Sequence, residues 1–144
     1  QEVILRNLDV FNCAVVEIFH LCLHNFPVDT DIVTGDLAVK VSEYFEQQDD
    51  EDFFYQFLEI EKICTYTLSW LHNEGYIRFN RYSATESRAV LTEKGLNAVN
   101  SVPKSIKGEK TFKDIFSGGI LKLSQPILTG VVVEFFKQQL GNVS

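Results

Sequence analysis

The segment from Glu59 to Gly95 constrains the fold of this 144-residue chain more than any other part of its sequence. Its first half has apolar residues at steps of three and four, which indicates a helix, and Gly75 suits a left-handed helix stop. Alternation from Tyr76 to Tyr82 predicts a strand, Ser83–Ser87 a turn, and Arg88–Leu91 the return strand. We therefore expect a helix that leads directly into a β-hairpin.

Two helices are predicted ahead of the one that contains Glu59. Apolar residues recur with helical spacing from about Asp9 to Asn25. A strand of two or three residues then fits at Val28, and Asp29 or Asp31 suits the cap of a second helix, from about Ile32 to Gln47. The third helix resumes at about residue 52 and either runs unbroken to residue 73 or bends near residue 57.

Helix start and stop signals continue after the hairpin. Thr92 suits the N-cap of a helix over Glu93–Asn100, and Thr111 suits the cap of a short helix. A last helix is predicted from Ser124 to about Leu140. Together these patterns predict a mainly α fold with a small β-hairpin, and the chain length suits one well-buried core.

Two motifs carry a resemblance to a known superfamily. WLHNEGYIRF is a helix end followed by glycine and an apolar strand, and VLTEKGLNAV joins a strand to the next helix one hairpin later. With the order helix, strand, helix, helix, strand, turn, strand, the chain resembles winged helix-turn-helix regulators of bacterial transcription. The second motif resembles the strand-to-helix exit of the multiple-antibiotic-resistance and phenolic-acid regulator types, in which LTxxG follows the wing as Leu91–Gly95 does here.

The resemblance implies a winged helix-turn-helix domain over residues 1–103, followed by a linker and C-terminal helical extension over residues 104–144 that suits dimerisation. It implies a cytoplasmic, non-enzymatic, homodimeric transcription regulator that binds duplex DNA. The third helix would enter the major groove, and the wing would lie along a minor groove or phosphates. The implied nucleic-acid-binding residues are Lys62, Thr65, Tyr66, Ser69, His72, Arg78, Arg81 and Arg88.

The charge distribution supports a second interpretation. Residues 1–75 contain 3 basic and 15 acidic residues, a net charge of −12, whereas residues 76–144 contain 10 basic and 5 acidic residues, a net charge of +5. The predicted third helix contains Glu59 and Glu61 but only one basic residue, Lys62, and a polyanion is attracted to local positive charge. The alternative is a winged-helix protein-interaction module without sequence-specific DNA binding, whose contact surface is the acidic half and its exposed aromatic residues.

Cys13, Glu17, His20 and His24 share one face of the first predicted helix, and all four residue types can bind zinc or iron. They span about 16 Å at the helical rise, too far for one ion, so only His20 and His24 could share one. We interpret them as a polar helix face and expect no metal site and no cofactor. The three cysteines have no paired spacing, which is typical of buried thiols in a reducing compartment.

Catalytic and membrane functions have no support in the sequence. It contains no glycine-rich phosphate loop, no nucleophile elbow and no HExxH motif. The apolar run Ile127–Phe136 is about half the length needed to span a bilayer and contains Glu134. We therefore expect neither an enzyme nor a membrane protein.

Overall fold

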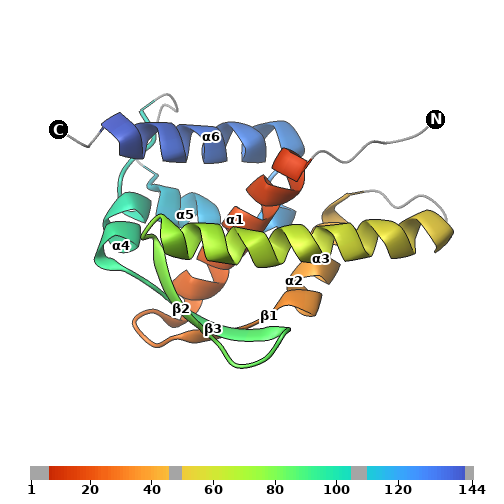
Figure 1. The fold of residues 1–144 in the computed structure, drawn as a ribbon. Coiled ribbons are helices and arrows are strands. Elements are labelled where there is room, and N and C mark those ends of the chain that lie inside the picture. Colours follow the sequence, from red (N-terminus) through yellow and green to blue (C-terminus); the bar gives the residue numbers. More distant parts are fainter. Residues whose placement is uncertain (1–6, 46–49, 105–109, 142–144) are drawn as a thin grey trace.

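A computed structural model describes residues 7–45, 50–104 and 110–141 of the chain. These residues form a mainly helical structure with one small antiparallel sheet, which confirms the expected fold class at this level (Figure 1). In chain order the elements are α1 (Asn7–Asn25), β1 (Thr30–Val33), α2 (Thr34–Tyr44), α3 (Asp50–Asn73), β2 (Ile77–Arg81), β3 (Glu86–Leu91), α4 (Glu93–Val99), α5 (Phe112–Phe116), the 3-10 helix η1 (Ile120–Lys122) and α6 (Gln125–Gly141).

The sheet has the strand order β1–β3–β2, so the hairpin is extended on one side by a strand from much earlier in the chain. Phe79 of β2 lies opposite Ala89 of β3, and Asp31 of β1 lies opposite Arg88 of β3. The predicted hairpin is confirmed. Strand β3 begins at Glu86, earlier than predicted, because its first residues pair with the end of β1.

The segment before α2 differs from the prediction. The strand begins at Thr30 instead of Val28, and Ile32 belongs to this strand and not to the helix. The N-cap of α2 is Val33, without a side-chain hydrogen bond, so the predicted caps Asp29 and Asp31 were wrong. The strand forms because it is hydrogen-bonded to β3, more than fifty residues further along the chain. Local helix signals give no information about such distant pairing. The helix also ends earlier than the predicted residue 47, since α2 stops at Tyr44 and Phe45 is already extended.

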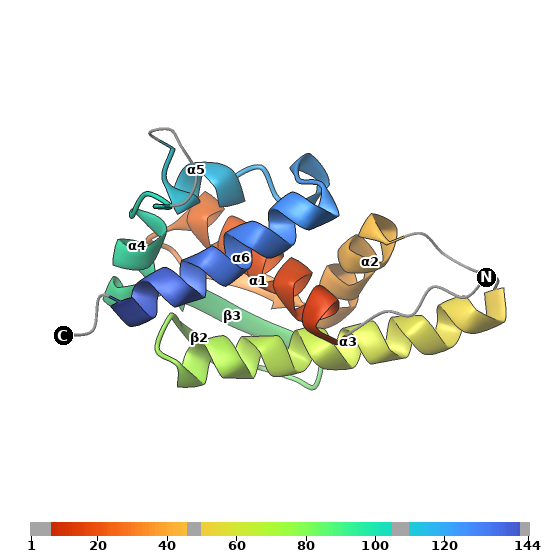
Figure 2. The same cartoon turned by 90° about the horizontal axis from the view of Figure 1, so that it is seen from above.

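Helix α1 lies at the centre of the molecule, and α2, α3, α5 and α6 all contact it. Figure 2 shows α6 crossing above α1, with the N-terminal part of α3 projecting beyond the rest. Helix α3 is unbroken over 24 residues, so the bend considered near residue 57 is absent.

Aromatic side chains join the C-terminal helices to α1. The ring of Phe19 stacks on Phe116 of α5 with 5.6 Å between centroids, and Phe135 of α6 lies 5.3 Å from Phe19. Phe112 also packs edge-on against Phe135 at 5.0 Å. All four rings are fully buried. Since truncation of such a ring costs about 3–5 kcal/mol, α5 and α6 contribute substantially to the core.

Two predicted helix caps are confirmed. The Thr92 hydroxyl accepts a hydrogen bond from the Gly95 N–H at 3.0 Å. Thr111 and Asp114 form a reciprocal capping box at the start of α5. The described part of the chain contains no helix that combines the length and apolarity required to cross a bilayer.

Candidate nucleic-acid interface

Four of the predicted DNA-contacting residues form a polar strip along the C-terminal half of α3. Lys62, Thr65, Ser69 and His72 follow one another at steps of three and four, which places them on one side of the helix. Lys62 and His72 are exposed, and Thr65 and Ser69 are half-buried. The Thr65 hydroxyl donates to the backbone oxygen of Glu61 at 3.0 Å, so only its acceptor lone pairs remain available.

The chain turns directly from this polar strip into the hairpin. Gly75 adopts a φ of 87°, and its N–H donates to His72 O while the Tyr76 N–H donates to Leu71 O. This pattern is a Schellman stop, which requires the left-handed conformation that glycine adopts most readily. The ring of His72 then packs edge-on against Phe79 of β2, with 5.1 Å between ring centroids. The polar strip therefore continues onto one face of the hairpin.

The two arginines of β2 lie on opposite faces of that strand. Side chains alternate along a strand, and Arg78 and Arg81 are three positions apart. Arg81 shares a face with Phe79, the residue that contacts α3, whereas Arg78 shares the other face with Asn80. Both arginines are exposed, and neither forms an ion pair with any described residue. Arg81 is thus the hairpin cation on the same side as the polar strip.

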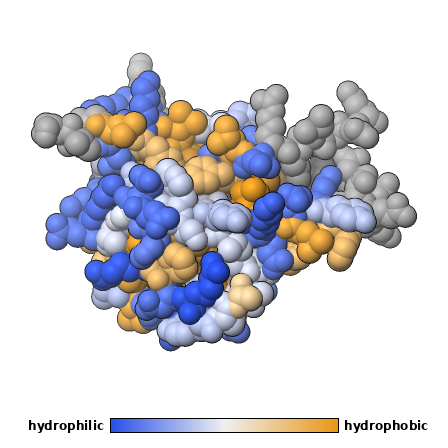
Figure 3. Space-filling model, in the orientation of Figure 1, coloured by the Kyte–Doolittle hydropathy of each residue, from blue (hydrophilic) through white to orange (hydrophobic). Residues whose placement is uncertain are grey.

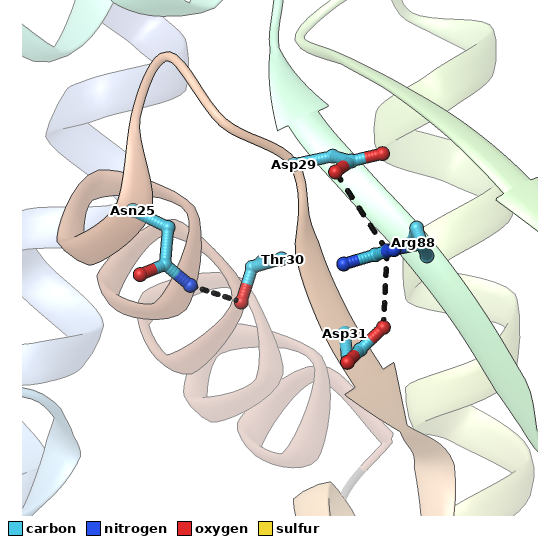
Figure 4. Close-up of polar contacts among 5 residues, drawn as sticks. All are labelled: Asn25, Asp29, Thr30, Asp31 and Arg88. Carbon is cyan, nitrogen blue, oxygen red and sulfur yellow. Dashed lines mark hydrogen bonds and ion pairs between the residues drawn. The ribbon is translucent and has the colours of Figure 1, made fainter.

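Arg88 of β3 has a different environment (Figure 4). Its Nε atom lies 3.1 Å from a carboxylate oxygen of Asp31 in β1 and 3.7 Å from one of Asp29, which immediately precedes β1. The Nε–H group does not point at either oxygen closely enough to donate a hydrogen bond, so the interaction is an ion pair only. Two carboxylates around one guanidinium leave this edge of the sheet with no excess positive charge. Arg88 is therefore poorly placed to attract a phosphate.

The turn of the hairpin is attached to the body of the molecule. The backbone oxygen of Thr85 accepts hydrogen bonds from both the N–H (2.9 Å) and the hydroxyl (3.3 Å) of Thr34, at the start of α2. Within the turn, the Ser83 hydroxyl accepts from the Glu86 N–H at 3.1 Å. These contacts hold the hairpin against α2 and limit how far its tip projects.

Tyr66 is predicted to lie with the polar strip, and the structure places it beside an apolar groove instead. The groove lies between the N-terminal end of α1 and α3. Its lining residues are Asn7, Leu8 and Phe11 of α1, and Ile63, Tyr66, Thr67 and Trp70 of α3. This hollow has a volume of about 420 Å³. A second hollow of about 230 Å³ shares Asn7 and Ile63 with it and extends the groove to Tyr55 and Glu59. Sequence spacing could have indicated this surface, because Ile63, Tyr66 and Trp70 follow at helical steps.

The candidate metal ligands of α1 are not assembled into a site. Cys13 and Glu17 are buried, so the predicted polar face was wrong for these two residues. Glu17 accepts a hydrogen bond from the Ile120 N–H at 3.1 Å, and His20 lies with its ring 6.3 Å from that of His24. Among the described residues, no three metal-ligating side chains come together in a suitable arrangement.

All three cysteines are free, buried thiols in the structure. Burial raises the pKa of Cys22 to about 12, and burial followed by the nearby Glu61 carboxylate raises the pKa of Cys64 to about 12. Burial is also the main cause of the raised pKa of Cys13. Such thiols stay protonated near neutral pH and are poor nucleophiles.

Comparison of this chain with family models, with curated proteins and with solved structures gives no match. Functional inference therefore depends on the polar strip, the hairpin cations and the apolar groove.

Proposed function

We propose that this chain is a winged helix-turn-helix protein that binds duplex DNA, with α3 in the major groove and the β2–β3 hairpin against the phosphate backbone. The observation that carries the proposal is the continuity of the polar strip of α3 with Arg81 of the hairpin, through the contact between His72 and Phe79. The element order and the strand order β1–β3–β2 support it. So does the Thr92–Gly95 exit from the hairpin, which resembles that of winged-helix regulators.

The charges of the surface favour backbone binding over base-specific recognition. Helix α3 contains five carboxylates and one lysine, Lys62, and it has no arginine for the bidentate recognition of guanine. Lys62 and Arg81 are the cations on the face that would meet DNA. Because each phosphate contact releases about one counterion, we expect weak binding with a shallow dependence on salt.

The proposal includes a twofold dimer that presents two α3 helices to successive major grooves. Exposed apolar side chains on the outer side of α6 support this arrangement, namely Ile127, Val133 and Leu140. A twofold axis would place the two α3 helices about 34 Å apart, one turn of DNA. Sedimentation of the purified protein tests the dimer directly, and substitution of Val133 and Leu140 by serine should give a monomer.

The DNA proposal is tested by fluorescence anisotropy with a labelled duplex of generic sequence at about 50 mM salt, repeated at increasing salt. Arg81→Ala should weaken binding and reduce the slope of log K against log salt by about 1. Arg78→Ala is the matched control, since it removes an equal charge from the opposite face of the same strand. Absence of binding at low salt, or equal effects of the two substitutions, would contradict the proposed contact surface.

The apolar groove is the specific observation that favours the second candidate function, a protein-interaction module. The polar strip and the groove lie side by side on α3, since Lys62 is one helical turn from both Glu59 and Tyr66. Substitutions outside α3, at Arg81 of β2 and Leu8 of α1, therefore test the two functions separately.

A further inference from the structure

Large hydrophobic side chains that line the apolar groove between α1 and α3 remain exposed to solvent. Leu8 is 71% exposed, Tyr66 66% and Trp70 39%. Trp70 rests edge-on against Phe11 and Phe136, with 5.2 Å between ring centroids in each pair, so its ring has a fixed orientation. Contiguous exposed apolar surface of this kind commonly marks a site of protein interaction. Figure 3 shows orange, apolar side chains over the projecting part of α3 and over α6.

We propose that this groove binds an amphipathic helix of another protein, whose apolar face enters the groove and whose flanks are basic. The proposal rests on the second candidate function, the protein-interaction module, and specifies its partner; it does not depend on DNA binding.

The shape and chemistry of the groove favour a helix over an extended peptide. Its α3 wall runs from Tyr55 to Trp70, about 22 Å at the helical rise, which matches a helix of about 15 residues. Both walls are helices, whose backbone groups are largely hydrogen-bonded within their own helix and offer few partners to a ligand. An extended peptide would leave its own N–H and C=O groups unsatisfied there, whereas a helix satisfies them internally. Helix-in-groove recognition then uses apolar anchors at steps of three and four.

The charge of the groove favours basic flanks. Glu59 lines it, and no basic side chain lines either of its two hollows among the residues that the structure describes. Glu59 is exposed, so its carboxylate is accessible to a ligand in the groove. Lysine or arginine beside the apolar face of a partner helix would therefore be attracted, and acidic residues would be repelled.

A second copy of this chain is a less suitable occupant. Its exposed apolar helix face is that of α6, where Ile127, Val133 and Leu140 follow at steps of six and seven. Such spacing provides one anchor in about every two turns, fewer than a helix-in-groove ligand supplies. The exposed cation on that side is Lys137, which offers little charge complementarity.

The single tryptophan of the chain makes the groove directly observable, because Trp70 lines it. The probe is a blocked synthetic peptide of about 18 residues, with leucine at steps of three and four and lysine elsewhere, but no tryptophan. One matched peptide has glutamate in place of lysine, and another has the lysine peptide composition in scrambled order. Titration of the full chain should shift the Trp70 emission to shorter wavelength, with the lysine peptide binding at least about tenfold more tightly than either control.

Variants of the protein complete the test. Leu8→Asn and Tyr66→Ser should each weaken binding of the lysine peptide about tenfold or more. Leu121→Asn is the matched control, because Leu121 is 61% exposed but lies on η1, outside the groove, and it should leave binding unchanged. Glu59→Lys should reduce the preference for the lysine peptide over the glutamate peptide. Arg81→Ala should not affect peptide binding, which separates this proposal from the DNA proposal.

Two results would overturn the proposal. Equal binding of the lysine, glutamate and scrambled peptides would show that the groove recognises neither a helical stripe nor its charge. Sedimentation that shows a wild-type dimer, and a monomer after Leu8→Asn or Tyr66→Ser, would show that a second copy occupies the groove.

Discussion

Gly95 offers the most direct test of how the hairpin is joined to α4. A β-carbon at this position would lie 2.1 Å from Tyr76 O, 3.1 Å from the Tyr76 carbonyl carbon and 3.2 Å from Leu91 Cδ2. The closest atom is backbone, so no side-chain rotation relieves the contact. The same oxygen accepts a hydrogen bond from the Thr92 N–H at 3.1 Å, whereas the single proton of the Thr92 hydroxyl has a nearer acceptor in Gly75 O, at 2.5 Å. Displacing Tyr76 therefore weakens the hydrogen bond from the Thr92 N–H.

The expected effect of Gly95→Ala is a sum of opposing contributions. Alanine favours a helix over glycine by about 1 kcal/mol. Overpacking costs about 1–3 kcal/mol, and the loss of one hydrogen bond costs about 0.5–1.5 kcal/mol. We therefore expect the free energy of unfolding to fall by about 0.5–3.5 kcal/mol, which lowers the melting temperature by about 3 °C for each kcal/mol.

The measurement is urea denaturation of the full chain followed by circular dichroism. Gly130→Ala is the matched control, because Gly130 is a helical glycine of α6 and a β-carbon added there would meet no atom within 4 Å. It should raise the free energy of unfolding by about 0.5–1 kcal/mol, through backbone propensity alone. A Gly95→Ala protein as stable as the wild type would refute the close contact and the destabilisation expected from it.

Three further predictions concern capping, a buried carboxylate and the thiols. Thr92→Ala should lower the free energy of unfolding by about 1–2 kcal/mol, as measured in urea, because it removes the α4 cap. Glu17→Ala should lower it by about 1–3 kcal/mol in the same assay, since the buried Ile120 N–H loses its acceptor, whereas Glu17→Gln should retain most of the stability. Burial raises the pKa of Cys22 and Cys64 from 9.0 to about 12. As the pH rises, the thiols lose their protons in the unfolded chain before they do so in the folded protein. The contribution of the buried thiols to the free energy of unfolding is therefore complete below pH 9 and declines toward pH 12. Cys22→Ala should reduce this decline, as measured by unfolding at a series of pH values.

Features that depend on neighbouring residues were predictable from the sequence. Gly75 stops a helix through its own φ, and Thr92 caps the next helix through an N–H three residues away. Thr111 acts in the same way at α5. Each of these interactions closes within a few residues, so the sequence contains nearly all of the relevant chemistry.

Features that depend on distant residues were not predictable in the same way. Strand β1 exists because of its pairing with β3, and Arg88 is neutralised by aspartates that the same pairing brings close. The buried Glu17 carboxylate accepts its hydrogen bond from the Ile120 N–H, which lies 103 positions further along the chain. The position of Tyr66 beside the groove depends on where α1 crosses α3, which helical periodicity alone does not determine.

The two proposed surfaces can be tested together through one residue, because Glu59 is an exposed carboxylate of α3 that lines the groove. A unit charge in water interacts with another about 10 Å away by about 0.4 kcal/mol, which is roughly a twofold change in affinity. Glu59→Gln should therefore strengthen DNA binding about twofold at low salt, by removing repulsion from phosphates. The same change should weaken binding of the lysine peptide, by removing an attraction.

Glu134→Gln provides the control, since it removes the same charge from α6 and should change neither affinity. Both effects of Glu59→Gln should disappear at about 0.3 M salt, where screening shortens the range of the interaction below the width of a helix. Opposite changes in the two affinities are the expected result, because the Glu59 carboxylate repels a polyanion and attracts a basic helix. A change of the same sign in both would mean that the substitution alters the fold of α3, and neither surface assignment could then be inferred from it.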